Sequence, residues 1–428
     1  MNYLKLNDGN YLYSVEKNTI INKESKKILE QHPDVGKVNI VRSRLSENDF
    51  KERVANVQQI SLETTQNCDL NCRYCVYGGA YKYQRPPAHN IMSWETARQT
   101  IDFFHHLCSH RENKRLAFSF YGGEPFLNFD LIRDTVNYAI QRFDGWDLHF
   151  FVTSNMTVMN DEIIDFIVKH NFKLSVSLDG PKEIHDKNRV FHDGSGSFEM
   201  IRDNLEKIRR KSEDFYNNIS FFAVFSNDTD IKKVHGFFTG DQLVKKNSCR
   251  LNPVSVYDTD YYEQYHYDRE SLLKDFGDVV RSIEEKKLQG REVLPMEHSF
   301  FNRYAILDEL LKVETFTTLA GTCLFDHKIY VDYSGRFHVC EKINNQFPFG
   351  DVRRGFDYAK MADMANQFAA IVEERCLDCP YNMLCGRCFV NFAKEGTFEF
   401  DENLCANRKK GIQQNLEAYL KFKGEGIL

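Results

Sequence analysis

The sequence predicts an α/β fold built around a parallel sheet, with a small α+β unit before it and a cysteine-rich segment after it. Strand-like and helix-like segments alternate from residue 57 to residue 254, which is typical of βαβ units and a parallel sheet. Polar and cysteine-containing motifs follow several of these strands. Most of the twelve cysteines fall into two clusters, one near residue 70 and one after residue 320.

Composition limits the class of protein. The chain has 428 residues, enough for about two or three domains, and its hydrophobic and charged fractions of 42% and 28% are ordinary for a globular protein. A net charge of -6 offers no basic surface for nucleic acid. No apolar run reaches the roughly 18 residues of a membrane span, and the first residues show no secretion signal. We therefore expect a cytoplasmic protein that binds neither nucleic acid nor membrane.

Residues 1–52 predict a small N-terminal unit. The segments YLKL, YLYSV and TII are expected as short strands, with the turn NDGN between the first two. The segment KESKKILEQH is expected as a short helix. This unit is therefore predicted to be a small α+β element of its own.

Six strand-like segments with helices between them predict the main domain, residues 53–255. The strands are expected at VQQISLETT, LAFSFYGG, LHFFVTSN, FKLSVSLDG, NISFFAVFSN and CRLNPV. Apolar residues at helical spacing, such as Ile201, Leu205 and Ile208, mark the helices. Six repeats favour a partial (βα)6 barrel, a curled sheet similar to part of a TIM barrel, with the active residues at the carboxyl ends of the strands.

Three further segments follow the main domain. Residues 256–317 are helical and charged, and SLLKDFGDVVRSIEEKKL is expected as an amphipathic helix. Residues 318–410 hold seven cysteines and little regular pattern, so we expect them to bury little apolar surface and to need metal to fold. Residues 411–428 are expected as a C-terminal helix.

Cys68, Cys72 and Cys75 lie in the segment NCDLNCRYC with the spacing C-x3-C-x2-C. A tetrahedral zinc site needs four ligands, and no fourth Cys or His follows closely. In a reducing cytoplasm, clustered cysteines indicate metal binding or catalysis rather than disulfides. A 4Fe–4S cluster usually takes four thiolates, so three thiolates would leave one iron free to bind another molecule.

The next three predicted strands also end in polar motifs. In strand order these are Gly122, Gly123 and Glu124; Ser154 and Asn155; and Ser177, Asp179 and Gly180. The carboxyl ends of parallel strands lie at the same edge of a sheet, so the three motifs are expected to meet the cysteine loop there.

The motif C-x3-C-x-aromatic-C after the first strand of such a barrel resembles the radical S-adenosylmethionine superfamily, and Cys68, Cys72, Tyr74 and Cys75 match it. The resemblance implies that the free iron chelates the amino and carboxylate groups of S-adenosylmethionine. One electron from the cluster would then cleave the sulfonium to a 5'-deoxyadenosyl radical, which abstracts hydrogen from a substrate. The resemblance further implies that the strand-end motifs bind the cofactor.

Gly122, Gly123 and Glu124 match the GGE motif of this superfamily. The glycines would let the backbone approach the cofactor, and Glu124 would accept hydrogen bonds from its ammonium group. Arg189 is a candidate to bind its carboxylate as a bidentate fork. The expected cofactor-binding set is completed by Tyr74, Ser154, Asn155, Ser177 and Asp179.

The C-terminal cysteines resemble the SPASM extension of the same superfamily, which implies two auxiliary 4Fe–4S clusters and three clusters in all. The outer auxiliary cluster would be held by Cys376, Cys379, Cys385 and Cys405, and the inner one by Cys323, Cys340 and Cys388. One departure is that two residues, rather than the usual three, separate Cys385 from Cys388. The alternative is a pair of zinc sites, since C-x2-C repeats are also zinc-ribbon spacing.

Seven C-terminal cysteines cannot fill two clusters of four ligands. Either the inner cluster keeps an open iron that binds a substrate thiolate, or Cys249 completes it from the end of the sixth strand. Glu341 directly follows Cys340, and in SPASM-containing sulfatase maturases an acidic residue in that place acts as the base on the substrate radical. Glu341 is therefore the candidate catalytic base, with a solvated surface glutamate as the alternative. Cys108 is expected to be a small buried apolar residue, and so is Cys249 unless it completes the inner cluster.

The resemblance leads us to expect an oxygen-sensitive maturase that installs a thioether or carbon–carbon crosslink in a ribosomally made peptide. It implies a flavodoxin- or ferredoxin-type electron donor. Residues 1–52 would bind the leader of the precursor peptide by pairing a leader strand with a sheet edge, or would form a truncated or structural cap. The alternatives are an anaerobic sulfatase maturase that forms formylglycine and a non-catalytic, metal-stabilised protein that binds peptides.

Overall fold

The computed structural model describes residues 3–6, 11–31, 36–83, 85–86, 88–255, 259–264 and 269–424. The predicted turn NDGN lies outside these residues. None of the helices in the described part of the chain combines the length and the apolar character that crossing a bilayer requires.

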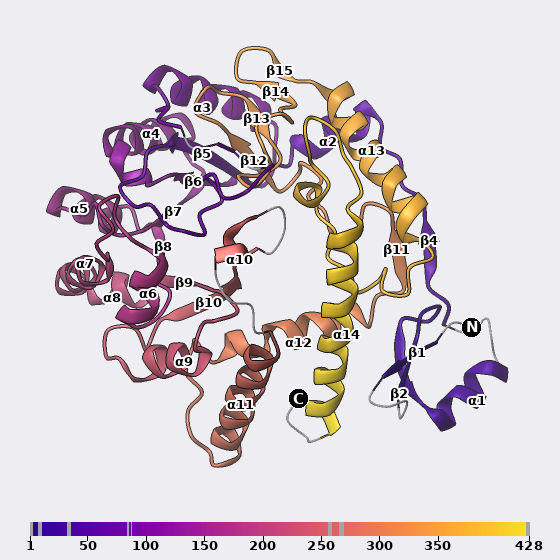
Figure 1. Cartoon of the computed structure of the whole chain (residues 1–428). Coiled ribbons are helices and arrows are strands. Elements are labelled where there is room, and N and C mark those ends of the chain that lie inside the picture. Colours follow the sequence, from indigo (N-terminus) through magenta and orange to yellow (C-terminus); the bar gives the residue numbers. More distant parts are fainter. Residues whose placement is uncertain are drawn as a thin grey trace.

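The largest sheet of the described residues, the central sheet, has eight strands in the order β10-β9-β8-β7-β6-β5-β12-β13 and lies in the left half of the view in Figure 1. Strands β5 to β10 are all parallel and follow one another in chain order, and each coincides with a predicted strand. Their bounds are β5 (Gln59–Thr65), β6 (Arg115–Gly122), β7 (Asp147–Ser154), β8 (Lys173–Ser177), β9 (Ser220–Phe225) and β10 (Ser248–Pro253). The predicted parallel α/β sheet is therefore confirmed.

Helices connect these strands and lie on the outer side of the sheet (Figure 1). They are α3 (Trp94–Cys108), α4 (Phe129–Arg142), α5 (Asp161–Lys169), α6 (Lys182–Asn188), α7 (Phe198–Lys211), α8 (Glu213–Asn217) and α9 (Ile231–Gly240). A 3-10 turn, η2 (Pro125–Asn128), precedes α4. Side chains cap the N-termini of several of these helices. Ser93, Asn160 and Asp230 each accept a hydrogen bond from a backbone N–H of the first turn of α3, α5 and α9.

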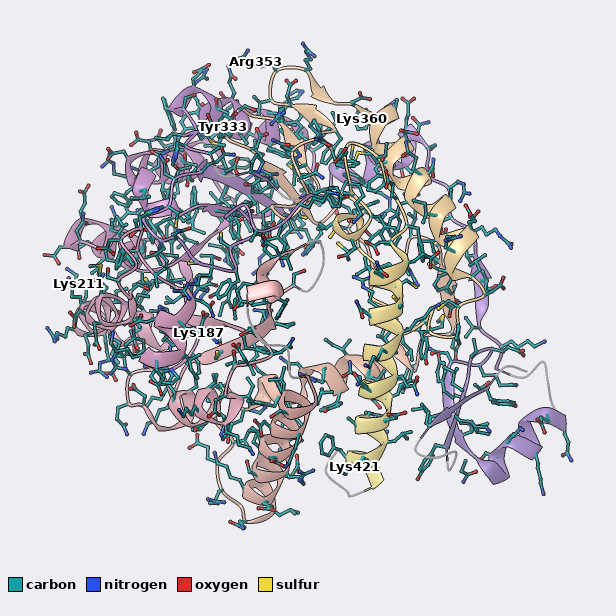
Figure 2. The ribbon with its side chains drawn as sticks, viewed as in Figure 1. Lys187, Lys211, Tyr333, Arg353, Lys360 and Lys421 are labelled. Atoms are coloured by element: carbon teal, nitrogen blue, oxygen red, sulfur yellow. The ribbon has the colours of Figure 1, made fainter. Side chains whose placement is uncertain are left out.

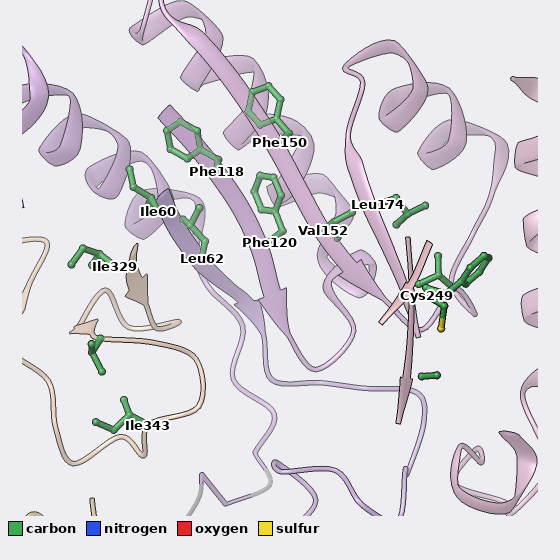
Figure 3. Packing of buried hydrophobic residues seen from close by; sticks show 14 of the residues in the cluster. Ile60, Leu62, Phe118, Phe120, Phe150, Val152, Leu174, Cys249, Ile329 and Ile343 are labelled. Carbon is green, nitrogen blue, oxygen red and sulfur yellow. The ribbon is translucent and has the colours of Figure 1, made fainter. Parts of the chain in front are cut away.

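Aromatic side chains fill the core between the sheet and these helices (Figure 3). Phe118 and Phe150 stack across β6 and β7 with ring centroids 6.2 Å apart, and Phe120 stacks on Phe172 at 5.9 Å. Cys108 is buried in the same core, which confirms its prediction as a small apolar residue. This aromatic packing holds the strands against one another and against the helices.

The N-terminal unit is an antiparallel sheet of order β1-β2-β3 followed by a helix, which confirms the predicted elements. The bounds are β1 (Tyr3–Leu6), β2 (Tyr11–Ser14), β3 (Thr19–Asn22) and α1 (Lys23–Gln31). Asn18 is buried and donates through Nδ2 to the carbonyl oxygens of Leu310 and Val313, at 2.6 and 3.0 Å. The small sheet is thereby attached to the end of helix α12 (His298–Leu310).

Between these parts lie α2 (Glu47–Val54) and β4 (Asn39–Val41), which pairs in parallel with β11 (Thr315–Thr317). The segment before β11 is helical, as predicted, with α10 (Tyr261–Gln264), α11 (Arg269–Leu288) and α12. Helix α11 contains the predicted amphipathic helix.

The prediction that residues 318–410 are irregular and bury little apolar surface was wrong. Strand β12 (Lys328–Val331) pairs in parallel with β5 and so extends the central sheet, and β13 (Phe337–His338), β14 (Gly350–Asp351) and β15 (Gly355–Phe356) come after it in the chain. Helix α13 (Tyr358–Cys376) buries Met361, Ala365, Phe368 and Val372 at helical spacing. After η3 (Phe389–Asn391), helix α14 (Glu402–Gly424) crosses the boundary expected at residue 410.

Candidate functional site

The loop that carries Cys68, Cys72 and Cys75 follows β5 and lies at the carboxyl edge of the central sheet. The motifs that end β6, β7 and β8 lie at the same edge, because these strands are parallel neighbours of β5. Ser177 is the last residue of β8 and is in register with Phe222 of β9. The structure thus brings the predicted motifs and the cysteine loop to one place.

Gly122 and Gly123 leave no room for a side chain. At Gly122, where φ is +134°, an added Cβ would lie 2.0 Å from the carbonyl oxygen of Thr65. At Gly123 it would lie 2.1 Å from the carbonyl oxygen of Asn67. The Gly123 N–H donates to the Thr65 oxygen at 2.9 Å, and the Glu124 N–H donates to the Asn67 oxygen at 2.8 Å. Only glycine permits this contact, so the GGE backbone directly supports the segment leading into the cysteine loop.

The Glu124 side chain joins the ends of β6 and β7. It is fully buried, and its carboxylate accepts hydrogen bonds from Ser154 Oγ at 2.9 Å, Asn155 N at 2.7 Å and Phe126 N at 3.1 Å. Burial raises the pKa of Glu124 to about 7 even though these donors favour the ionised form. The structure therefore shows a positioning contact for Glu124, and its contact with the ammonium group of a cofactor stays a prediction.

Asn155 contacts the cysteine loop directly. Its Nδ2 lies 3.7 Å from Cys68 Sγ and donates to Asp69 Oδ1 at 2.9 Å. Thr157 Oγ1 donates to the other oxygen of Asp69 at 2.5 Å. Hydrogen bonds to ligand sulfurs tune an iron–sulfur cluster, so the end of β7 both holds the loop and approaches one of its thiols. Sequence reasoning had not identified Asp69 or Thr157, because neither belongs to a motif.

A buried ion pair lies next to Cys72 and Tyr74. Asp179 accepts a hydrogen bond from Arg189 Nε at 3.1 Å and another from the Tyr74 hydroxyl, and the side chains of the pair are 1% and 9% exposed. Arg189 Nη1 lies 4.0 Å from Cys72 Sγ, and its guanidinium lies over the Tyr74 ring at 5.4 Å. Burial raises the pKa of Cys72 to about 12, and the Arg189 charge opposes this rise. Arg189 therefore favours the thiolate form that a metal binds.

His185 was not predicted as a functional residue, but it positions this pair. The Asp179 N–H donates to His185 Nδ1 at 3.3 Å, so the ring proton belongs on Nε2, which lies 3.0 Å from Ser197 Oγ. Ser197 Oγ in turn donates to the Arg189 carbonyl oxygen at 2.9 Å. Burial lowers the pKa of His185 well below its usual value, so the ring is neutral. The only sign of this positioning role in the sequence is that a histidine follows Asp179 by six residues.

We expect the D179N variant to be destabilised by about 3–5 kcal/mol, because it leaves the Arg189 charge buried without its counter-charge. Chemical denaturation of the anaerobic protein measures this change. The E95Q variant breaks an exposed pair with Arg98 and should change the stability little. Equal losses in the two variants would contradict the assignment of a buried, structurally required ion pair.

The C-terminal cysteines form two groups. Burial raises the pKa of the Cys323 and Cys340 thiols, and a Cys388 thiolate raises both further. Burial likewise raises the pKa of Cys376 to about 11, with added contributions from three nearby thiols, namely Cys379, Cys385 and Cys405. Each of these thiols therefore lies near another member of the set that the resemblance assigns to the same cluster.

The donor chemistry of all three cysteine groups fits iron–sulfur clusters. Each group consists of thiols, which are the ligands of such clusters. Within the described ranges, no three His, Cys, Asp or Glu side chains converge on a point that would hold one metal ion. In a 4Fe–4S cube each thiolate binds a different iron, so the ligands do not have to converge in this way.

Cys249 belongs to neither C-terminal group. It is 2% exposed and packs in the apolar core of the sheet (Figure 3), where burial raises the pKa of its thiol. It also lies at the start of β10, not at the end of that strand. The interpretation that Cys249 completes the inner cluster was therefore wrong.

Glu341 lies inside the protein. Its side chain is 16% exposed and its Oε2 forms an ion pair with Lys328 Nζ at 2.5 Å, so the alternative of a solvated surface glutamate was wrong. Burial raises the pKa of Glu341, but the contact with Lys328 outweighs this and holds the pKa below its usual value. The Tyr77 hydroxyl donates to the Glu341 carbonyl oxygen at 2.6 Å. Since Tyr77 is two residues from Cys75, this bond connects the N-terminal cysteine loop to the neighbour of Cys340.

A cavity of about 1150 Å³ opens between the end of β10 and helices α11, α12 and α14. Val254 and Tyr262 line it and pack in a small cluster with Tyr74 and Cys72. Cys385 also lines the cavity. The cavity therefore extends from the neighbourhood of the first cysteine loop to a cysteine of the C-terminal groups.

Comparison with known proteins agrees with this geometry. Residues 62–235 match the family described as the Radical SAM superfamily. These residues therefore form a radical SAM domain, which confirms the superfamily resemblance of this part of the chain. They contain the cysteine loop and the strand-end motifs described above.

Two curated relatives match parts of the chain. A cysteine-type anaerobic sulfatase-maturating enzyme of Clostridium novyi is 27% identical over 177 residues, which cover 41% of this chain and 46% of the relative. The radical SAM cyclopropyl synthase TigE of Paramaledivibacter caminithermalis is 25% identical over 247 residues, which cover 54% of this chain and 50% of TigE. The chain thus spans about half the length of these relatives.

A solved structure extends the similarity to most of the chain. The structure of native anSMEcpe with bound AdoMet and Kp18Cys peptide superposes with a TM-score of 0.63 at 18% identity. The superposed region covers 86% of this chain and 98% of the anSMEcpe chain. The two proteins therefore share a fold.

Proposed function

We propose that the chain is a radical S-adenosylmethionine oxidoreductase, located in the cytoplasm, that installs a thioether or carbon–carbon crosslink in a ribosomally made peptide. The observation that carries the proposal is the loop of Cys68, Cys72 and Cys75, which contacts Asn155 and Arg189 at the edge of a radical SAM domain. When bound, a 4Fe–4S cluster and S-adenosylmethionine would supply the hydrogen-abstracting radical. The structure of anSMEcpe, which holds AdoMet and a peptide, supports the proposal by analogy of fold.

The residues of this chain would hold and orient these groups. The three cysteines would bind three corners of the cluster, and Arg189 would favour the thiolate forms of Cys72 and Cys75. Arg189 is already paired with Asp179, so we propose that it uses its Nη atoms toward the carboxylate of the cofactor. The remaining cofactor-binding set proposed is Tyr74, Gly122, Gly123, Glu124, Ser154, Asn155, Ser177 and Asp179.

The proposal includes a partial (βα)6 barrel and a SPASM domain with two auxiliary 4Fe–4S clusters. The outer cluster would be bound by Cys376, Cys379, Cys385 and Cys405, and the inner one by Cys323, Cys340 and Cys388. The inner cluster would then keep an open iron for a substrate thiolate. The proposed divisions of the chain are residues 1–52, 53–255, 256–317, 318–410 and 411–428.

Glu341 is proposed to accept a proton from the substrate radical of the peptide. Because positioned bases contribute roughly 10²–10⁴-fold, we expect E341Q to slow peptide modification by about that factor, while the iron content stays unchanged. Mass spectrometry of the peptide measures this. E374Q, an exposed glutamate on α13, is the matched control. If both variants modify the peptide at the rate of the parent protein, Glu341 is not the base.

The N-terminal sheet is proposed to bind the leader of the precursor peptide. Its order places β1 and β3 at the edges, and an edge strand can pair with an extended peptide. Tethering the leader there would raise the local concentration of the segment to be modified. A flavodoxin- or ferredoxin-type protein is proposed as the electron donor.

The second candidate function is an anaerobic sulfatase maturase, and the similarity to the Clostridium novyi enzyme favours it. The anaerobically reconstituted protein should be reduced, supplied with S-adenosylmethionine and assayed for 5'-deoxyadenosine. It should then be co-expressed with a short peptide encoded beside it. A loss of two hydrogens with a crosslink supports the first function, and formylglycine in a sulfatase supports the second. Bound zinc with no cleavage of S-adenosylmethionine would support a non-catalytic peptide-binding protein and contradict both.

A further inference from the structure

We propose that the cavity between β10 and α14 selects a peptide segment that carries carboxylate side chains. This rests on the proposed function, because the segment would belong to the peptide substrate. Small-molecule sites usually measure about 300–1,000 Å³. A cavity of about 1150 Å³ exceeds that range and has room for several residues of an extended chain.

The described residues that line the cavity carry charge of the opposite sign to that of the whole chain. The chain has 62 acidic and 56 basic residues, yet the described residues that line the cavity include three arginines and neither aspartate nor glutamate. The arginines are Arg250, Arg303 and Arg408. These arginines would attract a peptide with negative charge.

Aromatic stacking holds two of these arginines in place. The Arg250 guanidinium lies over the Phe222 ring at 5.5 Å, and that of Arg303 lies over the Phe276 ring at 4.5 Å. Stacking fixes the plane of a guanidinium, and the donors along its edge are the groups that form bidentate bonds to carboxylates. Arg250 lies on β10, Arg303 on α12 and Arg408 on α14, so the three cations reach the cavity from different elements.

Side-chain amides supply further hydrogen-bond donors. The asparagines that line the cavity are Asn227, Asn252, Asn302, Asn407 and Asn415. Asn227 Nδ2 is buried and has no hydrogen-bond partner among the described residues. An unsatisfied buried donor is unfavourable, and a peptide carboxylate or carbonyl oxygen would satisfy it.

The position of the cavity suits this selection. Val254 and Tyr262 at its wall pack with Cys72 and Tyr74, and Cys385 forms another part of the wall. A segment held by its carboxylates would therefore place neighbouring residues beside the first cysteine loop. Selection by charge would thus fix which residue of the peptide reaches the reacting group.

The test measures peptide binding and cofactor cleavage on the same anaerobically reconstituted full-length protein. The protein is immobilised and incubated with a pool of random peptides in which Asp and Glu are as frequent as Asn and Gln, and retained peptides are identified by mass spectrometry. We expect Asp and Glu to be enriched about tenfold over their amides. Release of 5'-deoxyadenosine is recorded separately.

Three variants decide the role of the arginines. R250Q/R303Q should reduce the enrichment to less than about threefold, whereas R250K/R303K should give an intermediate enrichment, because lysine keeps the charge but not the stacked, bidentate guanidinium. R353Q removes an arginine on the outer surface (Figure 2) and should not alter the enrichment. No enrichment in the parent protein, or equal enrichment in R250Q/R303Q, would overturn the proposal. Cleavage without enrichment overturns this inference alone, and enrichment without cleavage overturns the proposed function alone.

Discussion

The C72A variant is expected to lose the cluster of the radical SAM domain and to cleave S-adenosylmethionine at least about 100-fold more slowly. Altering groups that merely orient a metal ligand typically costs about 10–100-fold, so removing the ligand itself should cost more. Cys72 Sγ also lies 4.0 Å from Nη1 of the buried Arg189. Iron and sulfide analysis and the release of 5'-deoxyadenosine measure the two losses.

The matched control is C108A, which removes a thiol buried in the core between the sheet and α3. It should keep both the iron content and the cleavage rate, because Cys108 lies in apolar packing. Full iron content and full cleavage in C72A would contradict the assignment of the cysteine loop.

The G123A variant is expected to destabilise the protein by about 3 kcal/mol or more and to impair cluster assembly. Inserting one methyl group into a packed site typically costs about 1–3 kcal/mol. Here the new Cβ would lie 2.1 Å from the backbone oxygen of Asn67, and backbone cannot rotate away as a side chain can. The segment leading to Cys68 would have to move, so the iron content should fall together with the stability. Chemical denaturation and iron analysis measure both.

Gly236 in α9 provides the control for this substitution. An added Cβ there meets nothing within 4 Å, and alanine is favoured over glycine in a helix by about 0.5–1 kcal/mol. G236A should therefore be neutral or slightly stabilising and should bind iron like the parent protein. A G123A variant that matches it in stability and iron content would show that the GGE backbone does not support the loop.

The sequence predicted the parallel sheet and the common edge of its motifs because both follow from local pattern. Strands such as β6 and β9 are apolar runs of the right length with turn residues after them. Once the strands are parallel, the places where they end coincide, and Gly123 and Asn155 come to the Cys68 loop without any further assumption. The spacing of Cys68, Cys72 and Cys75 is equally local.

The features of the fold and site that were not predicted depend on contacts between segments far apart in the sequence. The pairing of Lys328 with Glu341 and the packing of β12 on β5 cannot be inferred from either segment alone. The cavity combines β10 with α12 and α14, which are far apart in the sequence. Helix α13 is different, because Met361, Ala365 and Phe368 show helical spacing in the sequence. Because the neighbouring cysteines indicated metal binding, this segment was predicted to be irregular, and the apolar stripe of α13 was not recognised.

The central claim is that a 4Fe–4S cluster bound at three of its irons by Cys68, Cys72 and Cys75 keeps its fourth iron open for the cofactor. Electron–nuclear double resonance of the reduced protein with S-adenosylmethionine isotopically labelled in its amino and carboxylate groups tests this most directly. The account predicts a hyperfine coupling between the cluster and both labels, which disappears in C72A. A cluster that shows no coupling to the labels, and whose spectrum is unchanged when S-adenosylmethionine is added, would contradict it.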